Sequence, residues 1–188
     1  MNIMPAKIDP KKLIILDRDG VINQDSDDYV KSAEEWIPIP GSIEAIAKLY
    51  KNGYTICIAT NQSGLARGYF STSTLDAMHA KLNGLVEAAG GRIHSIEFCP
   101  HGPDDNCECR KPLPGMFKSI ADKFNLADLT GVYTVGDSLR DLQAGKQLNC
   151  STVLVKTGKG VRTIQSGKQL PEGTAIYNDL SEFVSAMV

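Results

Sequence analysis

The stretch Lys12-Leu13-Ile14-Ile15-Leu16-Asp17-Arg18-Asp19-Gly20 decides the fold of this 188-residue chain. Four consecutive apolar residues without alternation are typical of a strand buried on both faces, as in the parallel sheet of an α/β protein. Ligands of such sheets bind beyond the carboxyl ends of the strands. Residues i and i+2 of a strand share a face, so Asp17 and Asp19 are expected to point the same way. The stretch therefore predicts two carboxylates at the ligand-binding edge of a sheet.

The two aspartates by themselves have two interpretations. Carboxylates that lie close together repel each other unless a cation or a proton lies between them. Mg²⁺, a hard cation that prefers oxygen ligands, suits such a pair. In the alternative, one aspartate caps a turn and the other is solvated. The rest of the chain has to decide between a metal site and a turn.

Length and composition indicate an ordinary globular protein. We expect residues 1–188 to form a single domain, because this length can bury a substantial core. The net charge of −2 provides no basic field for nucleic acid or an anionic membrane. Residues 1–12 lack the apolar stretch of a signal peptide, and no span approaches the roughly 20 apolar residues of a membrane helix. We therefore expect a cytoplasmic protein, a monomer, with neither nucleic acid nor membrane as partner.

Apolar patterning predicts strands that alternate with helices, which indicates a three-layer, Rossmann-like α/β fold with a mostly parallel sheet. Ser42 is the expected N-cap of the first helix, and the residues after Thr157 are expected to be irregular. His79 is expected to serve only packing or the surface. Strands are predicted at residues 13–16, 54–59, 93–98, 131–135, 152–155 and 175–177, and helices at 42–51, 73–89, from 115, at 138–148 and from 181. Residues 21–40 are predicted to be a long loop beside the site.

Polar residues follow three further predicted strands. Thr60-Asn61-Gln62-Ser63-Gly64 offers hydroxyls, amides and backbone N–H groups for an oxyanion. Arg110-Lys111-Pro112 follows the third strand, and Asp137 ends the fourth, with Asp141 one helical turn later. Parallel strands bring these ends to one edge of the sheet, so the expected site combines acids, hydroxyls and cations.

This combination suits phosphoryl transfer to an aspartate. A carboxylate that attacks a phosphate monoester meets like charge, which Mg²⁺ and a lysine must offset. Asp17 would be the nucleophile and form an aspartyl-phosphate, and Asp19 would protonate the leaving oxygen and then activate water. A Walker-type phosphate loop is absent, because Thr157-Gly158-Lys159-Gly160 lacks the preceding glycine. We expect a surface loop there, with pocket lining as the alternative.

The four motifs together resemble the haloacid dehalogenase superfamily of phosphohydrolases. The resemblance implies that Thr60 binds the phosphoryl group and that Lys111 neutralises its charge. It also implies a Mg²⁺ site formed by Asp17, Asp137 and the backbone carbonyl of Asp19. With few residues between the strands, we expect no separate cap domain and an open site.

A second cluster, in the predicted zinc-binding loop 99–109, comprises Cys99-Pro100-His101 and Cys107-Glu108-Cys109. Three thiolates and one imidazole match a closed structural Zn²⁺ site; the alternative is free cysteines in a loop. A zinc-clamped loop would fix the direction of Arg110 and Lys111, which follow the last ligand. Cys57 and Cys150 are expected to be small core residues.

These motifs also resemble, more narrowly, the D-glycero-D-manno-heptose-1,7-bisphosphate 7-phosphatases, which act in ADP-heptose and lipopolysaccharide core biosynthesis. The five-residue gap in the zinc loop is instead similar to that of histidinol-phosphate phosphatases, whereas residues 62–68 look more like the heptose enzymes. A phosphotransferase acting on another small phosphorylated metabolite is a further alternative. The heptose likeness implies a small phosphorylated sugar as substrate and a catalytic contribution from Thr60 and Arg110. The implied substrate contacts are Asp25, Tyr29, Thr60, Asn61, Gln62, Ser63, Arg110 and Lys111.

Overall fold

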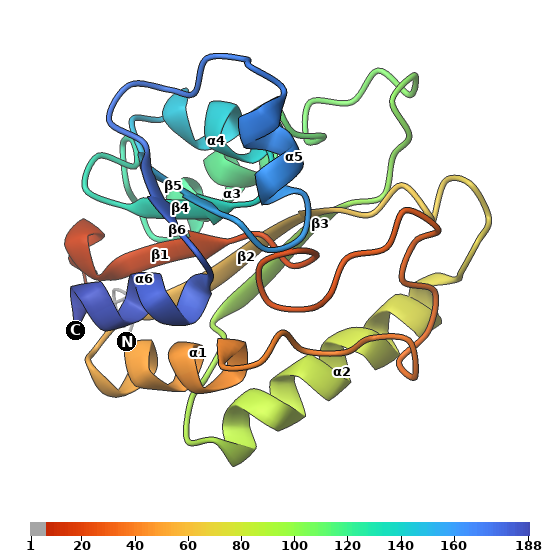
Figure 1. Ribbon diagram of the computed structural model, residues 1–188, viewed down its shortest axis with the longest axis horizontal. Coiled ribbons are helices and arrows are strands. Elements are labelled where there is room, and N and C mark those ends of the chain that lie inside the picture. The colour runs from red at the N-terminus through yellow and green to blue at the C-terminus, as the bar shows by residue number, and fades with distance from the viewer. Residues whose placement is uncertain (1–6) are drawn as a thin grey trace, which may run out of the picture.

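The computed structural model describes residues 7–188 and contains one six-stranded sheet in the order β3-β2-β1-β4-β5-β6 (Figure 1). Every neighbouring pair of strands is parallel. The strands are β1 (Leu13–Leu16), β2 (Thr55–Asn61), β3 (Ser95–Cys99), β4 (Tyr133–Gly136), β5 (Ser151–Val155) and β6 (Ala175–Tyr177). The predicted parallel α/β architecture is confirmed, and the strand that carries the two aspartates lies inside the sheet.

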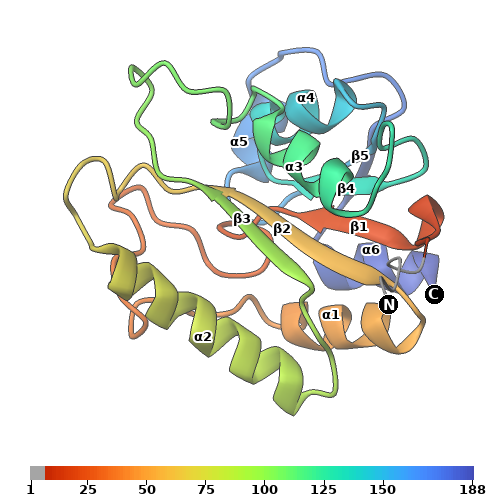
Figure 2. The same cartoon turned by 180° about the vertical axis from the view of Figure 1, so that it is seen from behind.

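Helices cover both faces of the sheet, which makes three layers. One layer contains α1 (Ser42–Lys51), α2 (Thr72–Ala88) and α6 (Leu180–Met187), and the other contains α3 (Gly115–Lys123), α4 (Leu139–Lys146) and α5 (Gly160–Gln165) (Figures 1 and 2). A short 3₁₀ helix at Pro10–Lys12 precedes β1.

The core is divided by the sheet into two apolar clusters. Ile14 and Leu16 pack into the cluster on the α1, α2 and α6 side, and Leu13 and Ile15 pack into the cluster on the opposite face. All four side chains are completely buried. This two-sided burial is the reason why the β1 sequence is apolar without alternation.

Three loops extend beyond the carboxyl ends of the strands and lie at the same end of the sheet (Figure 2). They span residues 17–41, 62–71 and 100–114. Within residues 7–188, none of these segments contains a helix or strand that could form a separate cap, which agrees with the prediction of a capless fold. No helix in this part of the chain has the length and apolar character needed to cross a bilayer.

Most predicted elements differ by one or two residues at their ends, and two predictions are wrong in kind. The region after Thr157 contains α5, whose only buried residue is Gly160, so no apolar period marks it in the sequence. Ser42 is not an N-cap: Gly41, at φ +83°, occupies that position, and the Ser42 hydroxyl donates to the carbonyl of Ile22 at 2.6 Å. β2 continues two residues beyond its predicted end. Residues 1–6, half of the segment in which no signal peptide is expected, lie outside the described residues.

Candidate active site

The centre of the site is a buried lysine between two aspartates. Lys111 Nζ lies 3.0 Å from Asp17 Oδ1 and 2.6 Å from Asp141 Oδ1, and it donates to the carbonyl of Ala59 at 2.7 Å. Asp17 continues β1, and its backbone N–H donates to Val135 of β4 at 2.9 Å. Asp141 belongs to the first turn of α4. The sequence places these three charges far apart, and the parallel sheet brings them together.

A third carboxylate completes the acidic cluster. Asp137 follows β4, and its Oδ2 accepts the backbone N–H of Lys159 at 2.8 Å. Carboxylate oxygens of Asp17, Asp137 and Asp141 all lie within 4.8 Å of one another. Gly20 and Gly158 approach Asp137 so closely that a Cβ at either position would collide with its carboxylate. The two glycines therefore leave the space in which this carboxylate lies.

The electrostatics of the cluster indicate a missing positive charge. Burial, followed by the charge of Asp141, raises the pKa of Asp17 to about 7 even though Lys111 opposes the shift. Burial and the neighbouring Asp141 and Asp17 carboxylates also raise the pKa of Asp137 well above its usual range. Burial disfavours the charge on Lys111, but Asp141 and Asp17 outweigh it and raise the lysine pKa to about 12. One lysine for three carboxylates fits a hard divalent cation among them.

Asp19 has a different environment, which holds it in one orientation. Its Oδ1 accepts from Arg18 Nε at 3.1 Å, Arg18 Nη2 at 2.8 Å and Asn23 Nδ2 at 2.8 Å. Its Oδ2 accepts a single bond, from Gln62 Nε2 at 2.9 Å. Burial raises the pKa of Asp19, but Arg18 and the hydrogen bonds from Asn23 and Gln62 outweigh burial, and the net pKa is lowered.

The predicted phosphate-binding segment connects β2 to the lysine loop. Thr60 is buried, and its hydroxyl accepts from Gln62 Nε2 at 3.0 Å. The Asn61 side chain accepts from the backbone N–H of Lys111 at 3.0 Å and donates to the carbonyl of Lys111 at 3.2 Å. Gln62 N–H donates to Cys99 at 2.8 Å. These bonds fix the register of Lys111 relative to β2.

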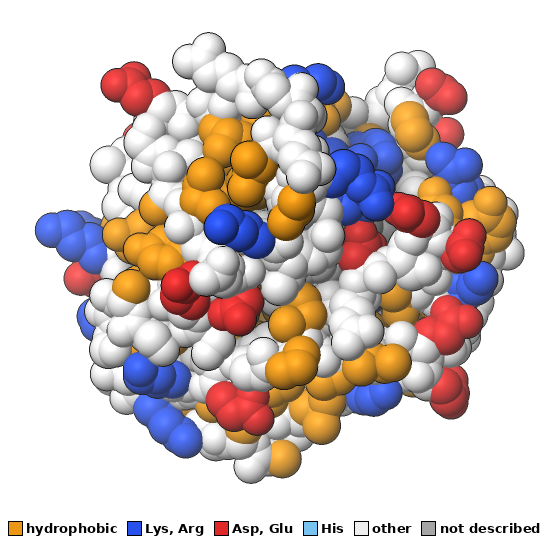
Figure 3. All heavy atoms as spheres, viewed as in Figure 1, with side chains coloured by type: hydrophobic (Ala, Val, Ile, Leu, Met, Phe, Trp, Pro, Cys, Tyr) orange, Lys and Arg blue, Asp and Glu red, His pale blue; other side chains and the backbone are white. Residues whose placement is uncertain are grey.

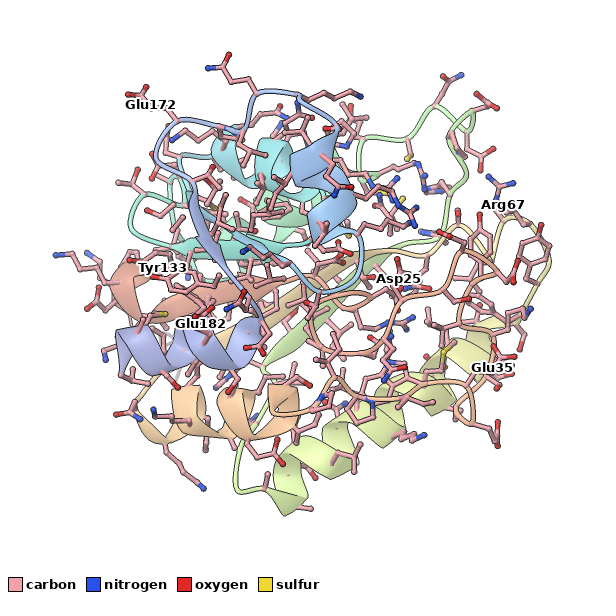
Figure 4. All side chains as sticks on the ribbon, in the orientation of Figure 1. Asp25, Glu35, Arg67, Tyr133, Glu172 and Glu182 are labelled. Atoms are coloured by element: carbon pink, nitrogen blue, oxygen red, sulfur yellow. The ribbon has the colours of Figure 1, made fainter. Side chains whose placement is uncertain are left out.

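A pocket of about 200 Å³ opens above the acidic cluster, and on the face shown in Figure 3 basic side chains border acidic ones around a hollow. Asp25 lies on the loop after β1, at the end of the sheet where the site forms (Figure 4). Predicted residues that line the pocket are Asp17, Asp19, Asp25, Tyr29, Asn61, Gln62, Ser63, Arg110, Lys111 and Asp137. Thr60 lies beneath this surface and is not among the lining residues.

The predicted zinc ligands also converge. Ligand atoms of Cys99, His101, Cys107 and Cys109 lie within 4.8 Å of one another, and all three cysteines are free thiols. Sγ atoms of Cys99 and Cys107 are 3.7 Å apart, and His101 Nδ1 is 3.5 Å from Cys99 Sγ. Zn–S bonds of ≈ 2.3 Å in a tetrahedron place two sulfur atoms about 3.8 Å apart. Cys109 Sγ lies 2.9 Å from Cys99 Sγ, closer than that spacing. The convergence of three cysteines and one histidine is therefore what suits a closed Zn²⁺ site.

Comparison of the chain with known proteins identifies the family to which it is similar. The family model described as HAD-hydrolase-like matches residues 108–183. A relative from Pseudomonas aeruginosa, named D-glycero-beta-D-manno-heptose-1,7-bisphosphate 7-phosphatase, is 57% identical over 178 residues, which is 95% of this chain and 98% of the relative. The chain belongs to this heptose-bisphosphate phosphatase family.

Other members of the heptose-bisphosphate phosphatase family agree with this result. A Neisseria meningitidis enzyme of the same name is 55% identical over 173 residues, 92% of each chain. The crystal structure of D,D-heptose 1,7-bisphosphate phosphatase from B. bronchiseptica, complexed with magnesium and phosphate, aligns with a TM-score of 0.91 at 55% identity and covers 94% of this chain and 97% of that one. The corresponding Burkholderia thailandensis structure aligns at a TM-score of 0.74 and 45% identity, over 94% and 97% of the two chains.

Two groups of site residues in this family member were missed from sequence. Asp141 was noted only for its spacing from Asp137, although that spacing places it in the first turn of α4, where it faces Lys111. Arg140 and Lys159 line the pocket. Lys159 belongs to the segment predicted to be a surface loop with pocket lining as the alternative, and the alternative is correct. Its Nζ lies 3.5 Å from Asp25 Oδ2. The Gly158-Lys159-Gly160 pattern was a signal for a close backbone approach that could have located it.

Proposed function

We propose that this protein is a Mg²⁺-dependent phosphatase that removes the 7-phosphate of D-glycero-beta-D-manno-heptose 1,7-bisphosphate, a step toward ADP-heptose and the lipopolysaccharide core. The observation that carries the proposal is the Lys111–Asp17 contact of 3.0 Å at the end of β1. It occurs in a chain whose relatives, matched over 95% and 92% of its length, are named as this enzyme. Those names also specify the beta anomer, which we adopt.

In the first step the Asp17 carboxylate attacks phosphorus, the bond from phosphorus to the sugar oxygen breaks, and an aspartyl-phosphate forms. The departing oxygen takes a proton from Asp19. Oδ1 of Asp19 already accepts three N–H groups, whereas Oδ2 accepts one. We therefore assign the transferred proton to Oδ2. The negative charge of an incoming phosphate raises the pKa of Asp19 and favours the protonated form.

In the second step a water molecule attacks phosphorus and the bond between Asp17 and phosphorus breaks. Asp19 is now ionised and accepts the proton of the water. Lys111 offsets the charge on Asp17 and on the phosphoryl group throughout, because its pKa of about 12 keeps it protonated. Buried Thr60, beneath the pocket, supports Gln62, and we propose that residues 60–63 bind the phosphoryl oxygens.

For Mg²⁺, we propose the carboxylates of Asp17 and Asp137 and the backbone carbonyl of Asp19 as ligands. The raised pKa values of Asp17 and Asp137 support this assignment, since burial and the neighbouring carboxylates outweigh the single cation, Lys111, that contacts Asp17. When bound, Mg²⁺ supplies positive charge that offsets the repulsion between phosphate and the attacking carboxylate. Asp141 differs from them in its pKa: burial raises it, but Lys111 at 2.6 Å outweighs burial and the net pKa is lowered. We assign Asp141 to positioning that lysine.

We further propose a structural Zn²⁺ at Cys99, His101, Cys107 and Cys109. The ion would hold the loop whose next two residues, Arg110 and Lys111, line the pocket. Arg110 Nη1 donates to the His101 carbonyl at 3.3 Å, so the loop also orients this arginine directly. Metal analysis of the purified chain is expected to give one zinc per molecule, and the Cys107→Ser variant is expected to lose it. A full complement of zinc in that variant would contradict the assignment.

The rim of the pocket supports the choice of a polar, phosphorylated sugar. Asp25 and Tyr29 come from the loop after β1, and Arg110 comes from the zinc-binding loop. Carboxylate and phenol groups can bind sugar hydroxyls, and an arginine suits a second phosphate. We propose these three residues, with Thr60 to Ser63 and Lys111, as substrate contacts and Arg110 as a contributor to turnover.

The remaining parts of the proposal concern the whole chain. We propose that residues 1–188 form one phosphatase domain with the zinc-binding loop at 99–109. Every described strand belongs to one sheet, which supports this. Five free cysteines favour a reducing compartment such as the cytoplasm.

Phosphate release from heptose 1,7-bisphosphate, measured beside histidinol phosphate in the presence of Mg²⁺, tests this function. We expect preferential turnover of the heptose bisphosphate and its loss in Asp17→Asn. Asp128→Asn is the matched control, because Asp128 is a surface group that accepts from Thr130 and Asn149 away from the pocket. Faster turnover of histidinol phosphate would refute the sugar assignment, and full activity of Asp17→Asn would refute the covalent mechanism.

A further inference from the structure

Arg18, between the two aspartates of the β1 motif, is a completely buried arginine. Its side chain does not enter the substrate pocket. Nε and Nη2 both donate to Asp19 Oδ1, at 3.1 and 2.8 Å. A guanidinium charge this deep is stable only if its N–H groups find acceptors. Its remaining terminal nitrogen therefore needs a partner from another element.

That partner is His79 on α2, 61 positions away along the chain. Arg18 Nη1 lies 3.2 Å from His79 Nε2, and the imidazole is 8% exposed. Arginine has donors and no acceptor, so Nη1 must donate and Nε2 must accept. His79 is therefore neutral, with its proton on Nδ1. Burial, followed by the charge of Arg18, lowers the pKa of His79 to about 4, in agreement with a neutral imidazole.

The helix that carries His79 is a rigid support. Leu75, Met78, Leu82 and Val86 of α2 are completely buried in the apolar cluster beneath the sheet. Asp19, in contrast, belongs to the long loop after β1, which contains no helix or strand. The contact thus connects a residue of an irregular loop to the packed core through two hydrogen-bonded steps.

We propose that His79 is a positioning residue for the phosphatase reaction: by accepting from Arg18, it holds the guanidinium that orients the Asp19 carboxyl group toward the substrate. Without the acceptor, Arg18 Nη1 is a buried, unsatisfied donor. The guanidinium is then free to turn away, and Asp19 loses two of the three donors that fix its Oδ1. The proposal rests on the proposed function for the reaction itself, but the Arg18–His79 contact does not depend on the identity of the sugar.

Imidazole ¹⁵N NMR of the full chain tests the contact independently of activity. His94 provides an internal reference of the opposite kind, because its Nδ1 accepts the backbone N–H of Ile56 at 3.1 Å and its proton must be on Nε2. We expect His79 to show the Nδ1–H tautomer at neutral pH and His94 the Nε2–H tautomer. An Nε2–H tautomer or a charged imidazole at His79 would overturn the proposal.

Steady-state kinetics of His79→Leu and His79→Gln tests the consequence. Leu removes the acceptor, whereas the Gln side-chain oxygen can replace Nε2. We expect kcat of His79→Leu to fall by about 10- to 100-fold, a part of the ~10²–10⁴ that general acid–base catalysis contributes, with KM within about threefold. His79→Gln should recover kcat to within about threefold of wild type. Met78→Leu is the matched control, a volume-conserving change at the adjacent buried position of α2.

Each outcome has a definite meaning. Unchanged kcat in His79→Leu, or a changed KM with unchanged kcat, would overturn the positioning role. Equal losses in His79→Leu and His79→Gln would show that shape, not the acceptor, matters, and would also overturn it. If the wild-type chain releases no phosphate, the proposed function and the positioning role of His79 are both refuted. The NMR result would still decide whether the Arg18–His79 contact exists.

Discussion

Replacing Lys111 by methionine tests the electrostatic centre of the site directly. The side chain keeps its approximate length but loses the ammonium group between Asp17 and Asp141. The lysine is 3% exposed, so water cannot replace it. The variant buries three neighbouring carboxylates without a cation when no metal is present.

The expected loss of stability follows from the two contacts. At 3.0 and 2.6 Å, each ion pair is worth about 6 kcal/mol of Coulomb attraction at an effective dielectric constant near 20. Desolvation of the ammonium group offsets most of this, and removing one partner of a buried pair typically leaves a net loss of about 3–5 kcal/mol. Asp17 and Asp137 can relieve the repulsion by binding protons, so the loss at pH 5 should be smaller than at pH 8.

Urea unfolding in EDTA at pH 8 measures this loss, and Lys123→Met is the matched control. Lys123 Nζ also lies 3.1 Å from a carboxylate, that of Glu97, but its side chain is 48% exposed, so the control should lose at most about 1 kcal/mol. Added Mg²⁺ should reduce the difference between Lys111→Met and wild type, because a bound cation replaces part of the missing charge. Equal stability of wild type and Lys111→Met in EDTA at pH 8 would refute the reasoning.

Three further predictions concern the same cluster. Burial and Asp141 raise the pKa of Asp17 from 3.8 to about 7, so the native state binds this proton more tightly than the unfolded state does. The proton's contribution to the free energy of unfolding is complete below pH 4 and is lost as the pH rises through 7. Asn does not titrate, so in EDTA the free energy of unfolding of Asp17→Asn should rise by about 4 kcal/mol relative to that of wild type between pH 4 and pH 8. The figure comes from about three pKa units at 1.36 kcal/mol each. A difference in urea unfolding that does not depend on pH would contradict this prediction. Asp141→Asn removes one partner of Lys111 and should weaken turnover or Mg²⁺ affinity by about 10- to 100-fold, as for other groups that orient a ligand set; calorimetric titration with Mg²⁺ that matches wild type, with normal turnover, would exclude that role. Gly20→Ala introduces a Cβ at φ +86° against the Asp137 carboxylate and should lower stability by about 1–3 kcal/mol as well as turnover, whereas Gly53→Ala, at φ +83° with open space around it, should lower stability without lowering kcat.

Much of the site could be predicted because its information is local. The Asp17 and Asp19 pair follows an uninterrupted apolar run, and burial on both faces of a parallel sheet makes such a run readable in one dimension. The proposed zinc ligands are equally local, since Cys99, His101, Cys107 and Cys109 lie at the end of β3 and in the loop that follows it. Residue types and short spacings were sufficient for both groups.

Other features depended on surroundings that no short window contains. Ser42 has the residue type of an N-cap, but the approach of the Ile22 carbonyl gives its hydroxyl another partner. α5 has six residues and buries only Gly160, so amphipathic periodicity does not reveal it. For both Ser42 and α5, the surroundings in the fold decided the outcome, and the local sequence pattern did not.

By itself, the sequence determined a parallel α/β sheet, a carboxylate pair at the end of one of its inner strands and a cluster of three cysteines and one histidine, because strand burial and loop spacing are short-range properties. Only the tertiary structure decided that Lys111 lies between Asp17 and Asp141 and that His79 supports the Arg18–Asp19 pair. Those contacts join different strands, loops and helices, and their distances follow from how α2 and α4 pack on the sheet. The position of the Asp17 and Asp19 pair can thus be predicted from the sequence, whereas the charged groups that shift the pKa values of the pair are brought to it by the fold.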